Sequence, residues 1–219
     1  MKVKDVFKEI FTGYNMNNST SSEDYTQTVN FINKNSIQYT NIIKDKLINK
    51  KINTNVKFKY YMQERDIIIS LKKPHKVGTY RKIDIWRDNE KVIIPNNFVI
   101  LRGIDTDKYS YIFLANYLEN IGIDKYIEEK STIGELKISD IENIELPDIS
   151  KEKQMTITNL LNNINDRSTA YELILKNDED IKKYVLNEVI GEENDKWFKR
   201  WNKNVFDKEK KISFTSSHW

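Results

Sequence analysis

The densest group of chemically useful side chains is the charged run Glu128-Glu129-Lys130, with Asp105 and Asp107 upstream. Carboxylates beside a lysine are the residue types with which a nuclease holds Mg²⁺ and activates a water molecule. Charged triplets of this kind are also common on lysine-rich protein surfaces. We therefore favour a solvated turn, and keep a small Mg²⁺-dependent nuclease that uses Glu128 and Lys130 as an alternative.

Other catalytic constellations are missing from the sequence. His75 and His218 are the only histidines and the chain has no cysteine, which excludes a cluster of histidine or thiolate metal ligands. No Gly-x-Ser-x-Gly motif is present. The six glycines are too dispersed for a dinucleotide-binding fingerprint or a phosphate-binding loop. We predict no catalytic residue, no metal site and no cofactor on this chain.

A second group of functional side chains is basic and surrounds one predicted turn. Lysines there would neutralise DNA phosphates, and an arginine or histidine could reach base edges, while Gly78 permits close approach to a phosphate. Asn15 and Asn17 could each pair with adenine through two hydrogen bonds. The net charge of +3 does not by itself establish a nucleic-acid partner, so a solvated loop remains the alternative. The predicted DNA contacts are Asn15, Asn17, Lys72, Lys73, His75, Lys76, Tyr80, Arg81, Lys82, Arg87, Lys130 and Thr132.

The segments that must position these residues predict a sheet with helices packed on it. Short β-branched or aromatic runs between turn residues predict strands at 67–69, 83–86, 92–94 and 98–101, paired antiparallel in succession. The apolar spacing of 111–121 predicts a helix on that sheet, ended by Gly122. A helix is also predicted over 25–51, a loop at 131–134 and a short element at 138–144. The predicted fold class is α+β, with a mixed or antiparallel sheet, followed by a long coiled-coil-forming helix.

The longest regular stretch predicts a single helix from Ser150, its N-cap, to Gly191, its end. Its apolar residues follow the three- and four-residue spacing of a coiled-coil seam, and a domain of this size cannot cover all of them. The alternative is that this apolar side folds back on its own domain. The predicted seam residues are Ile157, Leu160, Leu161, Ile164, Tyr171, Ile174, Leu175, Ile181, Val185 and Val189.

Three parts therefore divide the chain: a domain at 1–149, the helix at 150–191, and a basic aromatic tail at 192–219 with no assigned role. The absence of cysteine agrees with a reducing compartment. No apolar run approaches the roughly 18 residues that a membrane span requires, and the N-terminus has no signal-peptide core. We predict a cytoplasmic protein without a membrane contact.

Four segments follow one another in an informative order. They are Val3-Lys4-Asp5-Val6-Phe7 through Gly13-Tyr14, Arg65-Asp66-Ile67-Ile68-Ile69-Ser70, Tyr111-Ile112-Phe113-Leu114 with Tyr117-Leu118, and Ile141 to Pro147 followed by Lys151 to Gln154. This order resembles the specificity (S) subunits of type I restriction-modification systems. In that family a recognition domain opens with Leu-Gly-Asp-Val-Phe … Gly, contains a Gly-Asp-Ile-Leu-Ile-Ser strand, and leads through Ile-Pro-Leu-Pro … Glu-Gln into a spacer helix. Here Arg65 replaces the strand motif's glycine, the proline-rich turn is reduced to Leu146-Pro147-Asp148, and Gln154 stands in the place of the family's glutamine.

The resemblance covers about residues 1–191 and implies a protein without an active site. Such subunits read double-stranded DNA and hold methyltransferase (M) subunits, which bring S-adenosylmethionine, while a separate motor-nuclease subunit cleaves. Ordinary members have two recognition domains and two spacer helices, so this chain looks like one half and is expected to form a homodimer through antiparallel helices. About forty residues at roughly 1.5 Å each give a spacer of about 60 Å. Two identical reading heads would recognise an interrupted palindrome.

An alternative of a different class is a protein that binds restriction-modification subunits without DNA. A decoy that occupies the M subunit and blocks the normal specificity subunit would be one example.

Overall fold

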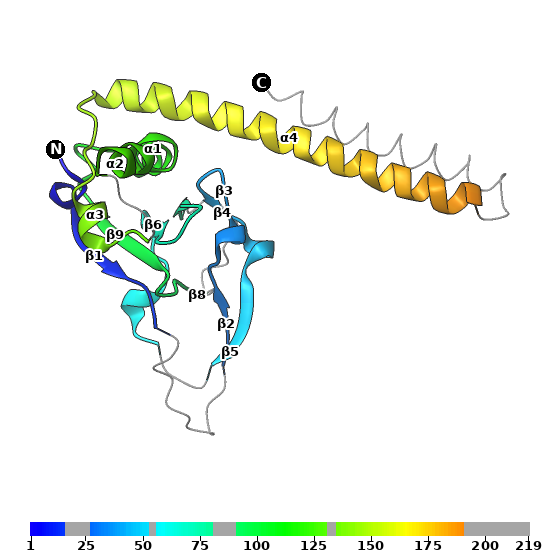
Figure 1. The fold of residues 1–219 in the computed structure, drawn as a ribbon, viewed down its shortest axis with the longest axis horizontal. Coiled ribbons are helices and arrows are strands. Elements are labelled where there is room, and N and C mark those ends of the chain that lie inside the picture. The colour runs from blue at the N-terminus through cyan, green and yellow to red at the C-terminus, as the bar shows by residue number, and fades with distance from the viewer. Residues whose placement is uncertain (16–26, 53–55, 81–90, 131–134, 191–219) are drawn as a thin grey trace. The chain divides into compact units, whose positions relative to one another are not determined.

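The computed structural model describes residues 1–15, 27–52, 56–80, 91–130 and 135–190. Its contacts divide the chain into two compact units, residues 1–163 and 164–219, which are described separately. The described residues of the first unit form two β-sheets, three α-helices and the start of a long helix, so the predicted α+β class is confirmed (Figure 1). The predicted strand at 83–86, the loop at 131–134, the end of the long helix at Gly191 and the tail at 192–219 lie outside the described residues.

A six-stranded mixed sheet forms the centre of the first unit. Its order is β1 (Phe7–Thr12), β9 (Phe98–Ile104), β6 (Ile67–Ser70), β7 (Val77–Thr79), β4 (Asn41–Ile42) and β3 (Ile37–Gln38), with β4 and β7 parallel and the other neighbours antiparallel. β6 and the first part of β9 are buried on both faces, which explains their continuous apolar sequence. The strands predicted at 67–69 and 98–101 are therefore confirmed.

Side chains of β6 alternate between two cores because successive residues of a strand point to opposite faces. Ile67 and Ile69 pack against the helices, together with Leu114 and Leu118. Ile68 packs on the other face, against a second layer. The first unit is thus built as helices, a central sheet and a smaller sheet.

The smaller sheet has the order β5 (Ile48–Ile52), β2 (Gln27–Phe31) and β8 (Val92–Ile93). β2 pairs antiparallel with β5 and parallel with β8, so the predicted successive antiparallel pairing of 92–94 is wrong. The reason lies in burial on both sides of the segment: Val92 and Ile94 pack against the central sheet, whereas Ile93 belongs to the core of the smaller sheet.

The predicted helix over 25–51 is also wrong. The described part of this stretch forms β2, β3, β4 and β5, joined by the short 3₁₀ turns η3 (Lys34–Ser36) and η4 (Lys44–Lys46). Asparagine competes for backbone hydrogen bonds and favours turns. Asn33 shows this directly, since its Oδ1 accepts hydrogen bonds from the backbone N–H groups of Asn35 (2.8 Å) and Ser36 (3.2 Å).

The helical layer consists of α1 (Tyr111–Tyr117), a π-helical turn η6 (Leu118–Gly122), α2 (Ile123–Lys130) and α3 (Ile138–Glu142). The helix predicted at 111–121 is confirmed, but Gly122 does not end it, because the chain stays helical to Lys130. Gly122 instead permits close packing: a Cβ there would lie 2.9 Å from the Tyr117 ring.

The predicted long helix is confirmed as α4 (Lys151–Ile190). The Ser150 hydroxyl accepts a hydrogen bond from the Lys153 N–H at 3.4 Å, as an N-cap does. The buried Gln154 amide fixes the first turn to the domain by donating to the carbonyls of Lys108 (2.9 Å) and Ile149 (3.1 Å) and accepting from the Ser110 N–H (2.9 Å). No helix in the described ranges is long and apolar enough to cross a membrane.

Candidate nucleic-acid interface

Charge is distributed unevenly between the layers of the first unit. Residues 27–60, which contribute β2 and β5, carry seven lysines against one aspartate, a formal charge of +6. Residues 105–149, which contain α1, α2 and α3, carry eleven carboxylates against four lysines, a formal charge of −7. In Figure 1 the lower ends of β2 and β5 lie away from α1 and α2. A polyanion would therefore be attracted to the smaller sheet and repelled by the helical layer.

The basic residues of the smaller-sheet segment are accessible. Six of its seven lysines are exposed: Lys44, Lys46, Lys50, Lys51, Lys57 and Lys59. None of the DNA contacts predicted from the sequence lies in this segment, most of which the sequence predicts to be helical. The signal that could have found this surface is the charge count itself, which does not depend on secondary structure.

The predicted basic turn lies between β6 and β7, beside the acidic helical layer. Lys76 Nζ is 3.7 Å from Glu119 Oε1, and Lys72 Nζ is 4.0 Å from Glu135 Oε2. Lys34 Nζ donates to the backbone carbonyls of Lys72 (2.6 Å) and Lys73 (2.9 Å). Part of the turn's positive charge is therefore balanced by carboxylates, while Lys34 brings a further cation to it.

A hollow of ≈ 430 Å³ adjoins this turn and is lined by Lys73, Pro74, His75, Glu119, Ile123 and Asp124. The Nδ1 of His75 lies 3.0 Å from the Ser70 carbonyl oxygen, and its Nε2 is buried without a hydrogen-bond partner among the described residues. Burial raises the pKa of Glu119. The Lys76 ammonium and the backbone N–H groups of Val77 and Thr40 oppose this rise. The hollow joins groups of both signs and does not form a simple cation-rich phosphate site.

The remaining predicted DNA contacts do not form one cluster with this turn. Asn15 lines a separate hollow of ≈ 310 Å³ together with Asn33 after β2, Lys50 of β5, and Asn96 and Asn97 of the β8–β9 turn. Tyr80 is half-buried just after β7, and Lys130 is the last residue of α2. Asn17, Arg81, Lys82, Arg87 and Thr132 lie outside the described residues, so their roles stay predictions.

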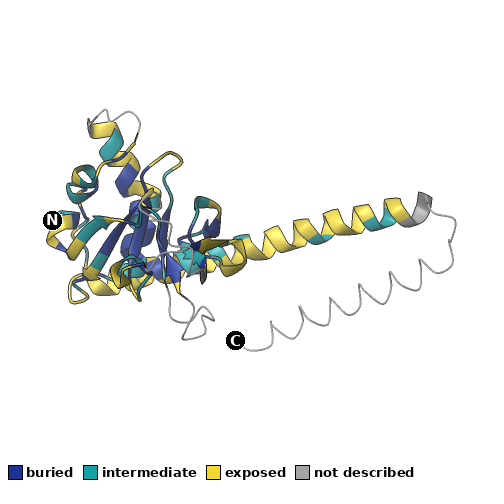
Figure 2. Cartoon of the chain, turned by 90° about the horizontal axis from the view of Figure 1, so that it is seen from below, coloured by how far each residue is buried: buried dark blue, intermediate teal, exposed yellow. Residues whose placement is uncertain are grey.

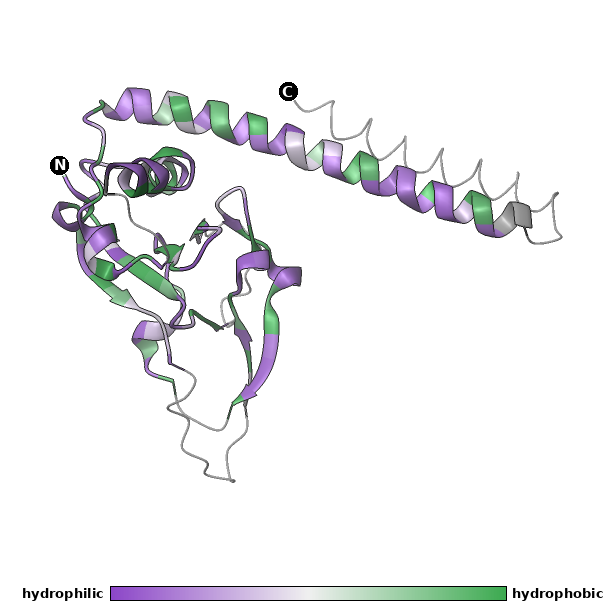
Figure 3. Ribbon diagram, viewed as in Figure 1, coloured by the Kyte–Doolittle hydropathy of each residue, from purple (hydrophilic) through white to green (hydrophobic). Residues whose placement is uncertain are grey.

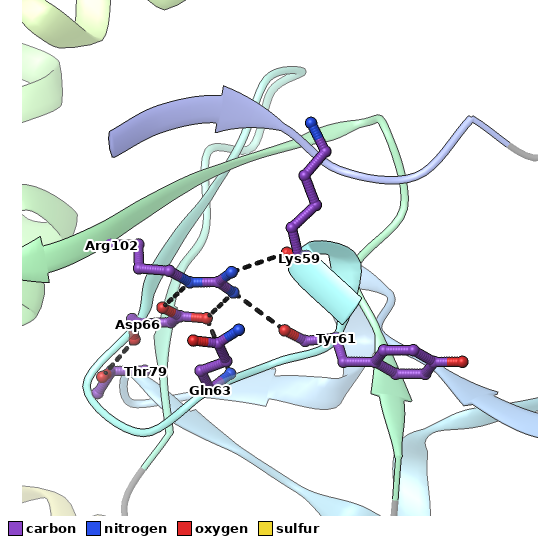
Figure 4. A network of polar contacts seen from close by, with 6 residues as sticks. All are labelled: Lys59, Tyr61, Gln63, Asp66, Thr79 and Arg102. Atoms are coloured by element: carbon purple, nitrogen blue, oxygen red, sulfur yellow. Dashed lines mark hydrogen bonds and ion pairs between the residues drawn. The ribbon is translucent and has the colours of Figure 1, made fainter. Parts of the chain in front are cut away.

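A buried ion pair connects the strand motif to the smaller sheet (Figure 4). The Asp66 carboxylate, 1% exposed, accepts from Arg102 Nε (2.8 Å), Arg102 Nη2 (2.6 Å) and the Gln63 N–H (2.8 Å). Arg102 also donates to the carbonyls of Lys59 (2.9 Å) and Tyr61 (3.0 Å). Burial raises the pKa of Asp66, and the guanidinium opposes that shift. The pair therefore positions η5 (Phe58–Tyr60) against β6 and β9.

The backbone conformation of Arg65 explains why a glycine would suit this position, where the strand motif of the resembled family has one. Arg65 precedes β6 with a φ of 66°, in the left-handed region that glycine adopts without strain. The motif thus sets the turn that places Asp66 for its bonds to Arg102.

The carboxylates considered for nuclease chemistry are dispersed over the helical layer. Asp105 accepts from the Asp107 N–H (3.1 Å) and lies 3.3 Å from Lys108 Nζ. Glu128 and Glu129 are exposed on α2, where Glu129 pairs with Lys125 at 3.8 Å. Within the described ranges, no three His, Asp or Glu residues are arranged to hold a metal ion.

The predicted seam of α4 is largely uncovered (Figure 2). In the first unit, Gln154 and Thr158 are buried whereas Ile157 and Leu160 are exposed, so the helix docks by a polar side. In the second unit most seam residues are also exposed: Ile164, Tyr171, Ile174, Leu175 and Ile181. Figure 3 shows hydrophobic bands recurring along α4. Leu161 and Val185 are half-buried, and the Val189 side chain is not described. Within the first unit, therefore, Ile157 and Leu160 are not buried on the helix's own domain.

Comparisons with known proteins identify the fold. No protein-family model and no curated protein matches the sequence. Solved structures do match, among them a chain of a type I R-M system studied for complex assembly and conformational transition, with a TM-score of 0.51, 16% identity, and coverage of 84% of this chain and 42% of that chain. A type I restriction-modification S subunit from M. genitalium matches with a TM-score of 0.50 and 14% identity over 94% of this chain and 49% of that chain. The HsdS subunit from Thermoanaerobacter tengcongensis matches with a TM-score of 0.49 and 16% identity over 80% of this chain and 38% of that chain.

The first two of these comparisons show a shared fold. Their identities of 16% and 14% do not show a shared function. The fold shared with these two chains is the mixed-sheet α+β domain followed by a long helix. The protein spans less than half the length of each of these solved chains.

Proposed function

We propose that this protein is a non-catalytic DNA-recognition subunit of a type I restriction-modification system. The observation that carries the proposal is the specificity-subunit fold, which extends over 84–94% of the chain in the first two comparisons. The basic segment 27–60 supports it, because neutralising phosphates supplies much of the affinity of DNA-binding proteins. The motif order that ends in Gln154 is independent support from the sequence.

DNA recognition on this scaffold would divide between two kinds of contact. Exposed lysines of the smaller-sheet segment would hold phosphates and fix the orientation of the domain, without distinguishing sequences. The hollow that contains Asn15, Asn96 and Asn97 would read base edges, since an asparagine amide can pair with adenine N6 and N7. The predicted contacts around Lys72–Lys76 would add phosphate contacts at the border of the helical layer.

The uncovered seam of α4 supports a paired state. Two copies would pack their seams antiparallel, bury the exposed leucines and isoleucines, and hold two recognition domains apart by about 60 Å, more than one DNA turn of roughly 34 Å. The paired helices would also dock the M subunits, which would bring S-adenosylmethionine, and any contact with the motor-nuclease subunit would be indirect. The target of such a homodimer would be an interrupted palindrome.

Selection from duplexes with randomised bases tests this function directly. The purified protein, alone and with its M subunit, should recover an interrupted palindrome, and light scattering should give twice the chain mass. Recovery of a continuous site would contradict the paired architecture. Absence of selection in both conditions would reject the DNA-recognition proposal.

A second candidate is an interaction protein that binds the M subunit without DNA. The observation that favours it is the helical layer of charge −7, which a polyanion would avoid and a basic protein surface could contact. Copurification with the M subunit, together with loss of methylation and no recovered DNA site, would support this candidate over the first.

A further inference from the structure

The Phe58 side chain is exposed in an unusual setting. It is 74% exposed, the largest value among the exposed large apolar side chains of the described residues. It begins the short 3₁₀ turn η5, and exposed lysines, Lys57 and Lys59, flank it in the sequence. A single exposed aromatic residue needs no explanation by itself, so the surroundings decide what this one can do.

The backbone around Phe58 is fixed on both sides. The side chains of Val56 and Tyr61 are buried in the core of the smaller sheet. The carbonyls of Lys59 and Tyr61 accept from Arg102, and the Tyr60 carbonyl accepts from the Ile94 N–H at 3.0 Å. Phe58 is therefore presented from a held turn, so that little conformational entropy remains to be lost when a ligand contacts the ring.

The charge around Phe58 indicates the class of ligand. Lys57 and Lys59 form no ion pair with the described residues, and they belong to the segment of charge +6. Lysine is depleted in protein–protein interfaces relative to the rest of the surface, so two exposed lysines beside an aromatic residue are not typical of a protein contact. Nucleic acid accepts both groups, since aromatic rings stack on bases while ammonium groups contact the adjoining phosphates.

We propose that Phe58 is a stacking wedge that contacts the bases of duplex DNA, with Lys57 and Lys59 on the neighbouring phosphates. This role of Phe58 rests on the proposed DNA-recognition function. Phe58 is not among the DNA contacts predicted from the sequence. A ring that inserts at a base step unstacks it, so flexible pyrimidine–purine steps would be preferred at that position even without a hydrogen bond to a base.

The test compares Phe58→Ala and Phe58→Trp with the wild-type chain on the duplex that the wild type selects. Base–aromatic stacking is worth about 1–3 kcal/mol per base, so Phe58→Ala should bind at least about 5-fold more weakly, and Phe58→Trp should restore most of the affinity. The slope of log K against log salt should stay unchanged for Phe58→Ala, because no charge is lost. Lys57→Ala and Lys59→Ala should each reduce that slope by about one.

Ile121→Ala is the matched control, because Ile121 is also an exposed apolar side chain, 54% exposed on η6 in the acidic helical layer. This substitution should leave DNA binding unchanged. If wild type selects a site and Phe58→Ala binds it within about 2-fold, the wedge is rejected while the recognition function stands. Loss of M-subunit binding in Phe58→Ala with unchanged DNA affinity would also reject it, in favour of a protein contact. If wild type selects no DNA, both proposals fall.

Discussion

Removing Arg102 should destabilise the first unit strongly, because it would leave a buried carboxylate without its cation. In Arg102→Met, Asp66 would lose both bonds to the guanidinium and keep the Gln63 N–H. Breaking a buried ion pair from one side typically costs about 3–5 kcal/mol, so we expect a loss of that size in the free energy of unfolding at pH 7. The carbonyls of Lys59 and Tyr61 would lose a donor as well, each worth roughly 1 kcal/mol.

The pH dependence separates this explanation from simple loss of packing. Burial already raises the pKa of Asp66, and removing Arg102 should raise it further. A carboxyl group whose pKa is raised by folding contributes stability that is present below its unfolded pKa of about 3.9 and is lost as the pH rises through the folded value. The loss in Arg102→Met should therefore be smaller near pH 4, where the loss of the bonds to the Lys59 and Tyr61 carbonyls remains, and should grow toward neutral pH as Asp66 ionises.

Urea unfolding between pH 4 and pH 8 measures the effect. The double variant Asp66→Asn with Arg102→Met removes both charges and should recover a large part of the loss at pH 7. A loss below about 1 kcal/mol, or one of equal size across this pH range, would refute the role given to the ion pair. The same variants should weaken DNA binding through Phe58, because Arg102 holds the turn that presents it.

Three further predictions concern single positions. Glu119→Gln should gain stability relative to the wild type as the pH rises from 4 to 8 in urea titrations, because burial raises the pKa of this carboxyl group. Arg65→Gly should leave the melting temperature equal or slightly higher, whereas Arg65→Val should cost about 1–2 kcal/mol, since φ is 66° there. Leu175→Lys, at a side chain 64% exposed, should abolish the dimer in light scattering and leave the helical circular dichroism of the chain largely intact.

The sequence predicted the parts of the fold whose signal is local. α4 and α1 have apolar residues at helical spacing. β6 is a continuous run of β-branched residues, which is typical of a strand buried on both faces. The stretch 25–51 misled because its strands are two to five residues long, too short for a clear alternation to emerge between asparagine turns. Which sheet each strand joins depends on contacts far along the chain, such as β2 with β8.

The candidate site was harder to predict than the fold, for a related reason. Lys72 and Lys76 form a basic cluster in the sequence, but Glu119 and Glu135, more than forty residues away, lie beside them in space. A cluster of cations can be recognised in the sequence, but the carboxylates that lie beside it from distant parts of the chain cannot. The excess of lysines in the segment 27–60 can be counted in the sequence, whereas the exposure of six of its seven lysines is known only from the structure.

The length of α4 offers a test of the paired architecture that depends on the geometry of both helix and DNA. An insertion of 21 residues that continues the seam adds three heptads, about 31.5 Å at 1.5 Å per residue. This matches nine to ten base pairs at 3.4 Å, close to one DNA turn, so both recognition domains would still face the same side of the duplex. A seven-residue insertion adds about 10.5 Å, or three base pairs, and would displace one domain by roughly 100° around the DNA.

Selection with the 21-residue variant should therefore recover the same bases with a spacer longer by nine or ten base pairs. The seven-residue variant should select poorly, although its seam is continuous and its dimer intact by light scattering. A four-residue insertion, which shifts the seam by half a heptad, should weaken the dimer itself. An unchanged spacer in the 21-residue variant would refute α4 as the element that sets the distance between two reading heads.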